Sequence, residues 1–287
     1  MLEKKYALSD EISVDFREFE RNQKITNLIL PKIENNNLFK LEKKDNSAKE
    51  IQSHTKMDSQ NICIKKILIQ NGSISPKTAE QIIKEEIFYF QKNALFHSKM
   101  LKVLAFDIKG SQVTLITESS DLGDLCNYYL KATQQEYQKH FSATILGIVE
   151  CIKYLHNAKV IHGNINPLNF FVFKNDSLFL EIKLGDFGLS NKLRSKDPND
   201  SLSIEGNEAP ELKGANSQEP SFPSDIYALG ITLNCFLLRV KLNPKKEISF
   251  SPLYPTINKI IKKCLIFNTQ ERIGIESLFQ KFSKIFF

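Results

Sequence analysis

Residues 160–173 read VIHGNINPLNFFVF, a polar loop between two apolar stretches. The preceding residues 136–157 repeat apolar positions with helical spacing, and residues 169–185 (NFFVFKNDSLFLEIKLG) alternate as two strands around a polar turn. The sequence therefore predicts a loop that joins a long buried helix to a β-hairpin. The loop has the frame of a catalytic loop, but it contains neither a carboxylate nor a cation.

The chain upstream of the long helix alternates between apolar and polar residues, as half-buried strands do. Five such runs predict a small sheet, and helical spacing between the third and fourth runs predicts one helix. The predicted strands are LFKLEKK, AKEIQSHTKM, NICIKKILI, MLKVLAFDI and SQVTLITES, and the predicted helix is AEQIIKEEIFYFQK.

The chain downstream of the hairpin is mainly helical in pattern. IYALGITLNCFLL is too short to span a bilayer and is typical of a buried helix, and TINKIIKKCLIF and IESLFQKFSKIFF predict two closing helices. We predict an α+β fold of two lobes, with a small β-rich lobe at 38–120 and a larger, mainly helical lobe at 121–287. Residues 1–37 are expected to form an extension with one amphipathic helix.

Composition limits the class of protein. The 287 residues are 41% hydrophobic and 25% charged, which is ordinary for a soluble globular protein. The N-terminal residues lack the apolar core of a secretory signal, so we expect a cytosolic or nuclear protein that does not associate with membranes. Five widely spaced cysteines form no CxxC pair, which predicts buried free thiols and neither disulfides nor a zinc site.

The net charge of +6 is concentrated near the C-terminus, where residues 239–287 contain ten basic and three acidic side chains. A lysine-rich solvated surface is the simplest interpretation. Attraction of nucleic acid or of an acidic protein is the alternative, although the segment lacks aromatic residues interleaved with the basic ones in a recognised motif.

Several motifs occur together in one order: a strand lysine, the loop at 160–173, Asp-Phe-Gly, Ala-Pro-Glu and a late arginine. In order and spacing they resemble the protein kinase family of the eukaryotic Ser/Thr type, over residues of about 38 to 287. One motif alone would be weak support, whereas five in sequence are specific. The segments that carry the resemblance are NICIKKI, VIHGNINPLNFFVF, KLGDFGLS, GNEAPEL, SDIYALG and NTQERIG.

The resemblance implies ATP and Mg²⁺ as cofactors. Lys65 matches the strand lysine that contacts the α and β phosphates. Glu86 matches the helix carboxylate that holds this lysine, with Glu80 and Glu85 as alternatives.

The remaining residues that the resemblance assigns to the nucleotide and its metal lie between positions 117 and 186. Glu118 matches the first hinge residue, whose backbone would meet the adenine, and Thr117 precedes it as the gatekeeper. Asp124 matches an acidic position that meets the ribose. Asn169 and Asp186 match the pair that holds magnesium between the phosphates.

The resemblance also implies residues that serve the fold. Glu211 and Arg272 match a buried ion pair that fastens the end of the activation segment. Asp225 matches a helix carboxylate that bonds the backbone of the catalytic loop, and His162 and Phe187 match part of an apolar column between the lobes.

The loop departs from the family where chemistry is performed. Asn164 stands where the family has the aspartate that accepts the substrate proton, and an amide has no useful basicity near neutral pH. Asn166 replaces the lysine that steadies the γ-phosphate, and Gly163 replaces an arginine. The first glycine of the chain is Gly72, so no glycine-rich loop precedes Lys65.

The substrate platform is also reduced. GNEAPE is shorter than the corresponding segment of the family, and residues 241–255 leave little room for the helix that docks protein substrates. Together these losses predict a catalytically impaired pseudokinase that acts as a scaffold or allosteric partner of another protein. The alternatives are a slow or atypical phosphotransferase that still binds ATP, and a subunit that associates with nucleic acid through the basic C-terminal segment.

Overall fold

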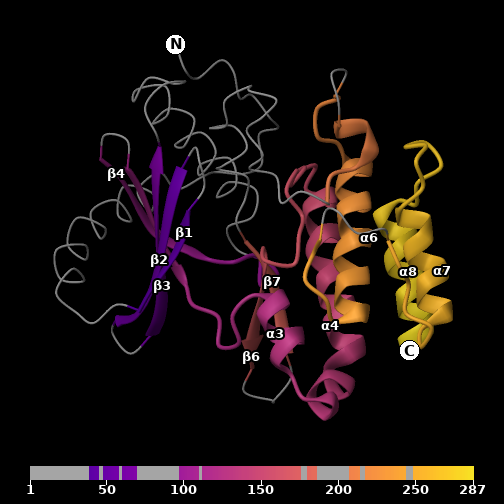
Figure 1. The fold of residues 1–287 in the computed structure, drawn as a ribbon, viewed down its shortest axis with the longest axis horizontal. Coiled ribbons are helices and arrows are strands. Elements are labelled where there is room, and N and C mark those ends of the chain that lie inside the picture. Colours follow the sequence, from indigo (N-terminus) through magenta and orange to yellow (C-terminus); the bar gives the residue numbers. More distant parts are fainter. Residues whose placement is uncertain are drawn as a thin grey trace.

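A computed structural model gives the fold, which consists of a β-sheet followed by a helical half (Figure 1). This arrangement confirms the predicted α+β fold with two lobes. The structure describes residues 39–44, 48–57, 60–69, 97–109, 112–175, 180–185, 207–213, 217–243 and 248–287. The N-terminal extension, the helix predicted at 79–92 and residues 186–206 lie outside these ranges.

The sheet contains five antiparallel strands in the order β1-β2-β3-β5-β4. Every strand predicted from the alternating pattern is present, and each boundary lies within a few residues of the prediction. The side chains of Ile62, Ile64 and Ile116 are almost fully buried and form its described core. The strands are β1 (Phe39–Lys44), β2 (Ala48–Met57), β3 (Gln60–Ile69), β4 (Val103–Lys109) and β5 (Gln112–Glu118).

The helical half begins directly after β5. The long helix, the hairpin and three later helices were predicted, whereas the short α3 was not. The elements are α3 (Leu125–Lys131), α4 (Gln134–Asn157), β6 (Phe170–Lys174), β7 (Leu180–Leu184), the 3-10 turn η1 (Pro210–Leu212), α6 (Phe222–Leu238), α7 (Pro255–Cys264) and α8 (Ile275–Phe286).

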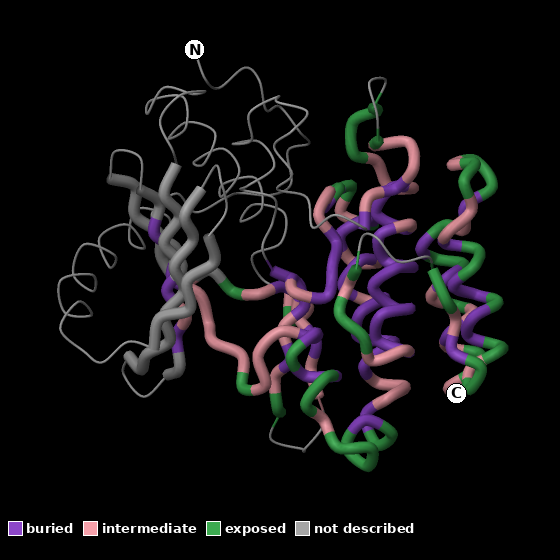
Figure 2. The backbone as a smooth tube through the Cα atoms, in the orientation of Figure 1, coloured by how far each residue is buried: buried purple, intermediate pink, exposed green. Residues whose placement is uncertain are grey.

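The two central helices begin at strong sequence signals. Thr133 and Glu136 form a capping box at the start of α4, and Ser221 and Ser224 form a similar pair at the start of α6. Most residues of α6 are buried, and Figure 2 shows this helix in the interior of the helical half. A Cβ atom on Gly230 would lie 2.7 Å from Cys264 Cβ, so glycine allows α6 and α7 to pack closely.

The segment at 97–101 connects the sheet to the helical half. Leu101 N–H donates to Leu184 O at 2.7 Å, and Leu184 N–H donates to Lys99 O at 2.8 Å. The His97 ring stacks on Tyr154 of α4 with centroids 3.7 Å apart. Strand β7 and helix α4 therefore hold the chain immediately before β4 in a fixed position.

Three further expectations can be compared with the described residues. Four of the five cysteines are buried free thiols, and burial raises the pKa of Cys264 to about 12. Residues 241–243 and 248–254 contain no helix, and residues 244–247 lie outside the described part, so the expected loss of the substrate-docking helix stays a prediction. Among the helices that the structure describes, none is both long enough and apolar enough to cross a bilayer.

Candidate functional site

Asp225 lies in the first turn of α6 and organises the loop at 162–169. Its Oδ1 accepts a hydrogen bond from Gly163 N–H at 2.9 Å, and its Oδ2 accepts one from His162 N–H at 2.9 Å. His156 Nε2 lies 3.0 Å from the same Oδ2. Asp225 is 2% exposed, so these contacts compensate for the hydrogen bonds with water that the carboxylate loses on burial. The loop backbone is thus tied to α6, as the resemblance implied.

His162 occupies the interior of the site. Its Nδ1 accepts a hydrogen bond from Asn164 N–H at 3.2 Å, so the proton is assigned to Nε2, which faces Gly185 O at 3.3 Å. Gly163 has a φ of 71°, a left-handed conformation that glycine adopts without strain. This conformation belongs to the turn in which two successive N–H groups bond Asp225. Phe187, the expected neighbour of His162 in the apolar column, lies outside the described residues.

Three asparagines form a network within the loop. Asn164 O accepts hydrogen bonds from Asn166 Nδ2 at 3.0 Å and from Asn169 Nδ2 at 2.8 Å. Asn166 Oδ1 accepts a hydrogen bond from Leu168 N–H at 2.9 Å. The amide of Asn166 therefore bonds the backbone on both sides, and the residue is completely buried.

The chemistry available to this loop follows from these contacts. Asn164 offers a neutral amide whose Oδ1 receives, among the described residues, a single long contact of 3.4 Å from Asn166 Nδ2. Asn166 is neutral and directed at the loop backbone, so it brings no positive charge to a phosphate. Within residues 162–169, His162 is the only ionisable side chain, and both of its ring nitrogens are engaged. The loop has no general base at Asn164 and no cation at Asn166.

Asn207 contacts the loop, although nothing in the sequence indicated this contact. Its Nδ2 donates to Ile165 O at 2.6 Å, so the segment before Ala-Pro-Glu is fastened to the loop. Its Oδ1 is buried and has no hydrogen-bond partner among the described residues. The shortened spacing of GNEAPE was visible in the sequence, but the pairing with residue 165 was not, because 42 positions separate the two residues.

Of the two residues expected to hold magnesium, Asn169 is the one whose side chain the structure describes. Its Nδ2 donates to Asn164 O, and its Oδ1 has no hydrogen bond with any residue that the structure describes. An amide oxygen is a ligand type that Mg²⁺ accepts, so this residue fits the metal. Asp186, Glu86 and the side chain of Lys65 lie outside the described part. Within that part, no group of three or more His, Cys, Asp or Glu residues could hold a metal.

The hinge residue Glu118 joins the two lobes through its side chain. Lys183 Nζ lies 2.9 Å from Oε2 and 3.1 Å from Oε1, and Lys102 N–H donates to Oε1 at 2.8 Å. The carbonyl oxygen of Glu118 accepts a hydrogen bond from Thr117 Oγ1 at 3.0 Å. The backbone group expected to meet the adenine thus already has an internal partner. No pattern in the sequence indicated Lys183 as a partner of Glu118.

Asp124, the expected ribose contact, acts as the N-cap of α3. Its Oδ1 accepts from Asn127 N–H at 2.8 Å, and its Oδ2 accepts from Asn127 Nδ2 at 2.5 Å. Both carboxylate oxygens are therefore engaged in starting the helix. A ribose hydroxyl would share these oxygens with the cap.

Gly185 packs tightly behind the loop, immediately before Asp186. A Cβ atom at this position would lie 2.7 Å from Leu101 Cδ2 and 2.9 Å from Phe171 Cε2. Its N–H donates to Asn169 O at 2.9 Å, and its carbonyl oxygen faces His162. Only a residue without a side chain fits between the 97–101 segment and β6.

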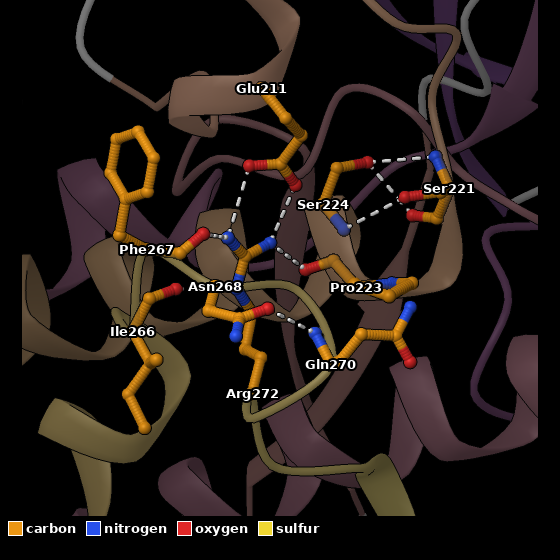
Figure 3. A network of polar contacts seen from close by, with 9 residues as sticks. All are labelled: Glu211, Ser221, Pro223, Ser224, Ile266, Phe267, Asn268, Gln270 and Arg272. Carbon is orange, nitrogen blue, oxygen red and sulfur yellow. Dashed lines mark hydrogen bonds and ion pairs between the residues drawn. The ribbon is translucent and has the colours of Figure 1, made fainter.

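Glu211 and Arg272 form a bidentate ion pair, shown in Figure 3. Arg272 Nη1 lies 2.6 Å from Glu211 Oε1, and Nη2 lies 3.0 Å from Oε2. Arg272 also donates to the carbonyl oxygens of Pro223, Ile266 and Phe267. Burial alone would raise the pKa of Glu211, but the hydrogen bond and charge of Arg272 outweigh burial and lower it.

Comparison with known proteins agrees with this geometry. The family model described as "Protein kinase domain" matches residues 46–282. Serine/threonine-protein kinase PLK4 of Drosophila virilis is 26% identical over 75% of this chain and 25% of its own length. Receptor-interacting serine/threonine-protein kinase 1 of Homo sapiens is 30% identical over 49% of the chain and 22% of its own length.

A third protein kinase matches this chain over a larger share of its own length. Aurora kinase of Debaryomyces hansenii is 30% identical over 62% of this chain and 42% of its own length. The chain thus spans less than half of the length of each of these relatives. Because the family model covers most of the sequence and the loop, hairpin and ion pair lie where the family places them, the chain belongs to the protein kinase family.

Proposed function

We propose that this kinase domain is a pseudokinase, which transfers phosphate poorly or not at all and acts as a scaffold or allosteric partner of another protein. The observation that carries the proposal is the asparagine network of the loop. Asn166 is buried and bonds the backbone at Asn164 and Leu168, where a kinase needs a cation facing the phosphate. Asn164 lacks the basicity to accept a substrate proton.

The size of the expected defect supports a non-catalytic role. Loss of a general base lowers rates by about 10² to 10⁴, and loss of one electrostatic donor to the transition state costs about 10² to 10³. Asn207 adds a second restriction, because it fastens the segment before Ala-Pro-Glu to Ile165. The contacts with Asp225 and Arg272, by contrast, are complete.

ATP with Mg²⁺ remains a proposed ligand of this domain. Asn169 supports metal binding, since its amide oxygen is a suitable ligand and accepts no hydrogen bond from any residue that the structure describes. The use of both Asp124 oxygens in the cap of α3, and the absence of a glycine before Lys65, argue for weaker binding than in a complete site. A bound nucleotide would then serve as a structural ligand.

The test of catalysis is phosphate transfer from γ-labelled ATP with the purified full chain, with generic protein substrates and without them. We expect incorporation no greater than in Asp186→Ala, a variant that lacks the second metal position of the family. Incorporation in the wild type that disappears in Asp186→Ala would support the alternative, a slow phosphotransferase. Asn169, the metal position that is retained, is the observation that keeps this alternative open.

The test of nucleotide binding is the thermal shift produced by millimolar ATP, with magnesium or with EDTA. We expect a small magnesium-dependent shift in the wild type and none in Asn169→Ala, each measured against the ligand-free melting temperature of the same variant. An equal shift in both proteins would mean that the nucleotide binds elsewhere. The complete absence of a shift in the wild type would remove ATP from the proposal.

A further inference from the structure

The outer side of α7 presents three lysines and no acidic residue. Lys259, Lys262 and Lys263 are exposed, whereas Ile257 and Ile261 on the other side of the helix are buried. Positions i, i+3 and i+4 lie on one side of a helix, so the three lysine side chains leave α7 from the same side. Figures 1 and 2 show α7 at the edge of the molecule, with exposed residues along it.

These lysines have no acidic partner within the described ranges. None of the three forms an ion pair with any residue that the structure describes, although Lys262 Nζ lies 4.8 Å from the centre of the Phe250 ring. Among the described acidic residues that follow α7, Glu276 pairs with Lys153, and Glu271 accepts a hydrogen bond from the neutral Asn268 amide. Within the described part of the chain, no carboxylate therefore pairs directly with the lysines on this side of α7.

Two large apolar side chains frame the same helix. Leu253, just before α7, is 76% exposed, and Phe267, just after it, is 78% exposed. Isolated exposed apolar residues are common, but here one lies before and one lies after the helix that carries the three lysines. We call Leu253, Lys259, Lys262, Lys263 and Phe267 the α7 face.

The N-terminal sequence contains a segment of complementary character. Residues 10–20 read DEISVDFREFE and contain five acidic residues and one arginine, a net charge of −4. Ile12, Phe16 and Phe19 follow the spacing i, i+4, i+7, which predicts one apolar stripe on a helix. The acidic residues 11, 15 and 18 repeat with the same spacing one position earlier, so they predict an acidic stripe beside the apolar one.

We propose that residues 10–20 dock on the α7 face, with their carboxylates beside the three lysines and their aromatic rings beside Leu253 and Phe267. The proposal does not depend on whether the domain is catalytic. The eighteen residues 21–38 separate the segment from β1 and can extend over about 60 Å. A domain of this length has a radius of gyration of about 19 Å, so the segment can reach α7 of its own chain as well as that of a second copy.

The experiment places benzoylphenylalanine at Phe16 of the full chain and maps the photo-cross-links by mass spectrometry. We expect cross-links within residues 250–268. The triple substitution Lys259→Glu, Lys262→Glu, Lys263→Glu should reduce them about tenfold, since three exposed ion pairs together contribute about 1–1.5 kcal/mol. The matched control reverses three other exposed lysines, Lys131, Lys139 and Lys174, and should leave the cross-links unchanged.

Charge exchange makes the test specific. Adding Glu11→Lys, Asp15→Lys and Glu18→Lys to the α7 triple variant should restore the cross-links, because the pairs are then reversed and not removed. A mixture of isotopically light and heavy chains shows whether the cross-link lies within one chain or between two copies, and either result supports docking of this segment.

Three outcomes would overturn the proposal. Cross-links from position 16 could map outside 250–268, or remain unchanged in the α7 triple variant, or fail to return after charge exchange. The α7 lysines could also govern binding to labelled RNA or to phosphatidylserine vesicles while the cross-links from position 16 map elsewhere. In that case the α7 face serves an anionic ligand and not this segment.

Discussion

Asp225 and Asn166 are both buried polar residues in contact with the loop at 162–169, but only Asp225 carries a charge. Asp225 is 2% exposed and accepts hydrogen bonds from two successive backbone N–H groups of the loop. Asn166 is 0% exposed and bonds the same loop with an amide that both donates and accepts. In the family, both positions are ionised.

The difference shows which charges the fold itself requires. A carboxylate that accepts backbone N–H groups stabilises the loop without any substrate, and the bidentate Glu211–Arg272 pair stabilises the end of the activation segment in the same way. A lysine at position 166 or an aspartate at position 164 would serve mainly a phosphate or a hydroxyl. Around the loop, the charges that support the fold are present, whereas neutral asparagines stand at positions 164 and 166, where the family has charges that act in transfer.

The largest expected effect is the removal of Arg272. Arg272→Ala leaves the Glu211 carboxylate and three carbonyl oxygens without their donor, and breaking a buried ion pair costs about 3–5 kcal/mol. Urea unfolding of the purified chain measures this loss. Arg272→Lys keeps the charge but not the planar pair of donors, so its loss should be smaller than that of Arg272→Ala. Equal losses would mean that charge alone matters.

A smaller effect is expected from crowding at Gly185. Gly185→Ala places a methyl group 2.7 Å from Leu101 Cδ2 and 2.9 Å from Phe171 Cε2, and overpacking of this kind costs about 1–3 kcal/mol. Gly274→Ala is the matched control, because nothing lies within 4 Å of its added methyl group. Gly274 is the N-cap of α8, where alanine is less favourable than glycine, so the control includes a small capping loss and the loss at Gly185 should exceed it. Equal values would show that the junction behind the loop can expand freely.

The asparagine network provides a third comparison. Asn166→Ala removes a donor to Asn164 O and the acceptor for Leu168 N–H, so we expect a loss of about 1–2 kcal/mol. Asn268→Ala is the exposed counterpart, since Asn268 Oδ1 accepts from Gln270 N–H at 3.1 Å with the same two-residue spacing. Its loss should stay below about 1 kcal/mol. A larger loss in Asn268→Ala would contradict a structural role for the buried amide.

The smallest effect concerns pH. The pKa of Glu211 is lowered in the folded protein, so its ionisation stabilises the fold above the ordinary value of 4.5, and this contribution disappears as the pH falls through the lower folded pKa. The stability difference between the wild type and Glu211→Gln should therefore shrink as the pH is lowered from 7 to 4. A constant difference over this range would show that the ionisation of Glu211 does not contribute to the stability of the fold.

The fold could be predicted largely from local patterns. Alternation predicted the strands, and helical spacing predicted α4 and the later helices, because each pattern repeats over many residues. Helix α3 was missed since it has only seven residues, LCNYYLK, too few for a clear period. Asp124 is the N-cap that begins this helix, whereas the resemblance implied that it contacts the ribose.

The site was predicted less completely, for a physical reason. Motif positions identified Asp225 and Arg272 because the family places charged residues there. The contacts Glu118–Lys183 and Asn207–Ile165 join residues 65 and 42 positions apart, and no local pattern indicates such pairs. The internal engagement of Asn166 and Asp124 also depends on side-chain directions that spacing alone does not give.

The most direct test compares Asp225→Ala with Asn164→Ala in equilibrium urea unfolding. Asp225→Ala leaves two backbone N–H groups of the loop without an acceptor, at about 1–3 kcal/mol each, so we predict a loss of at least about 2 kcal/mol. Within the described part of the chain, Asn164→Ala removes a single side-chain contact of 3.4 Å, and its loss should remain within about 0.5 kcal/mol. Equal losses would contradict the view that the loop retains the residues of the fold and not those of phosphate transfer.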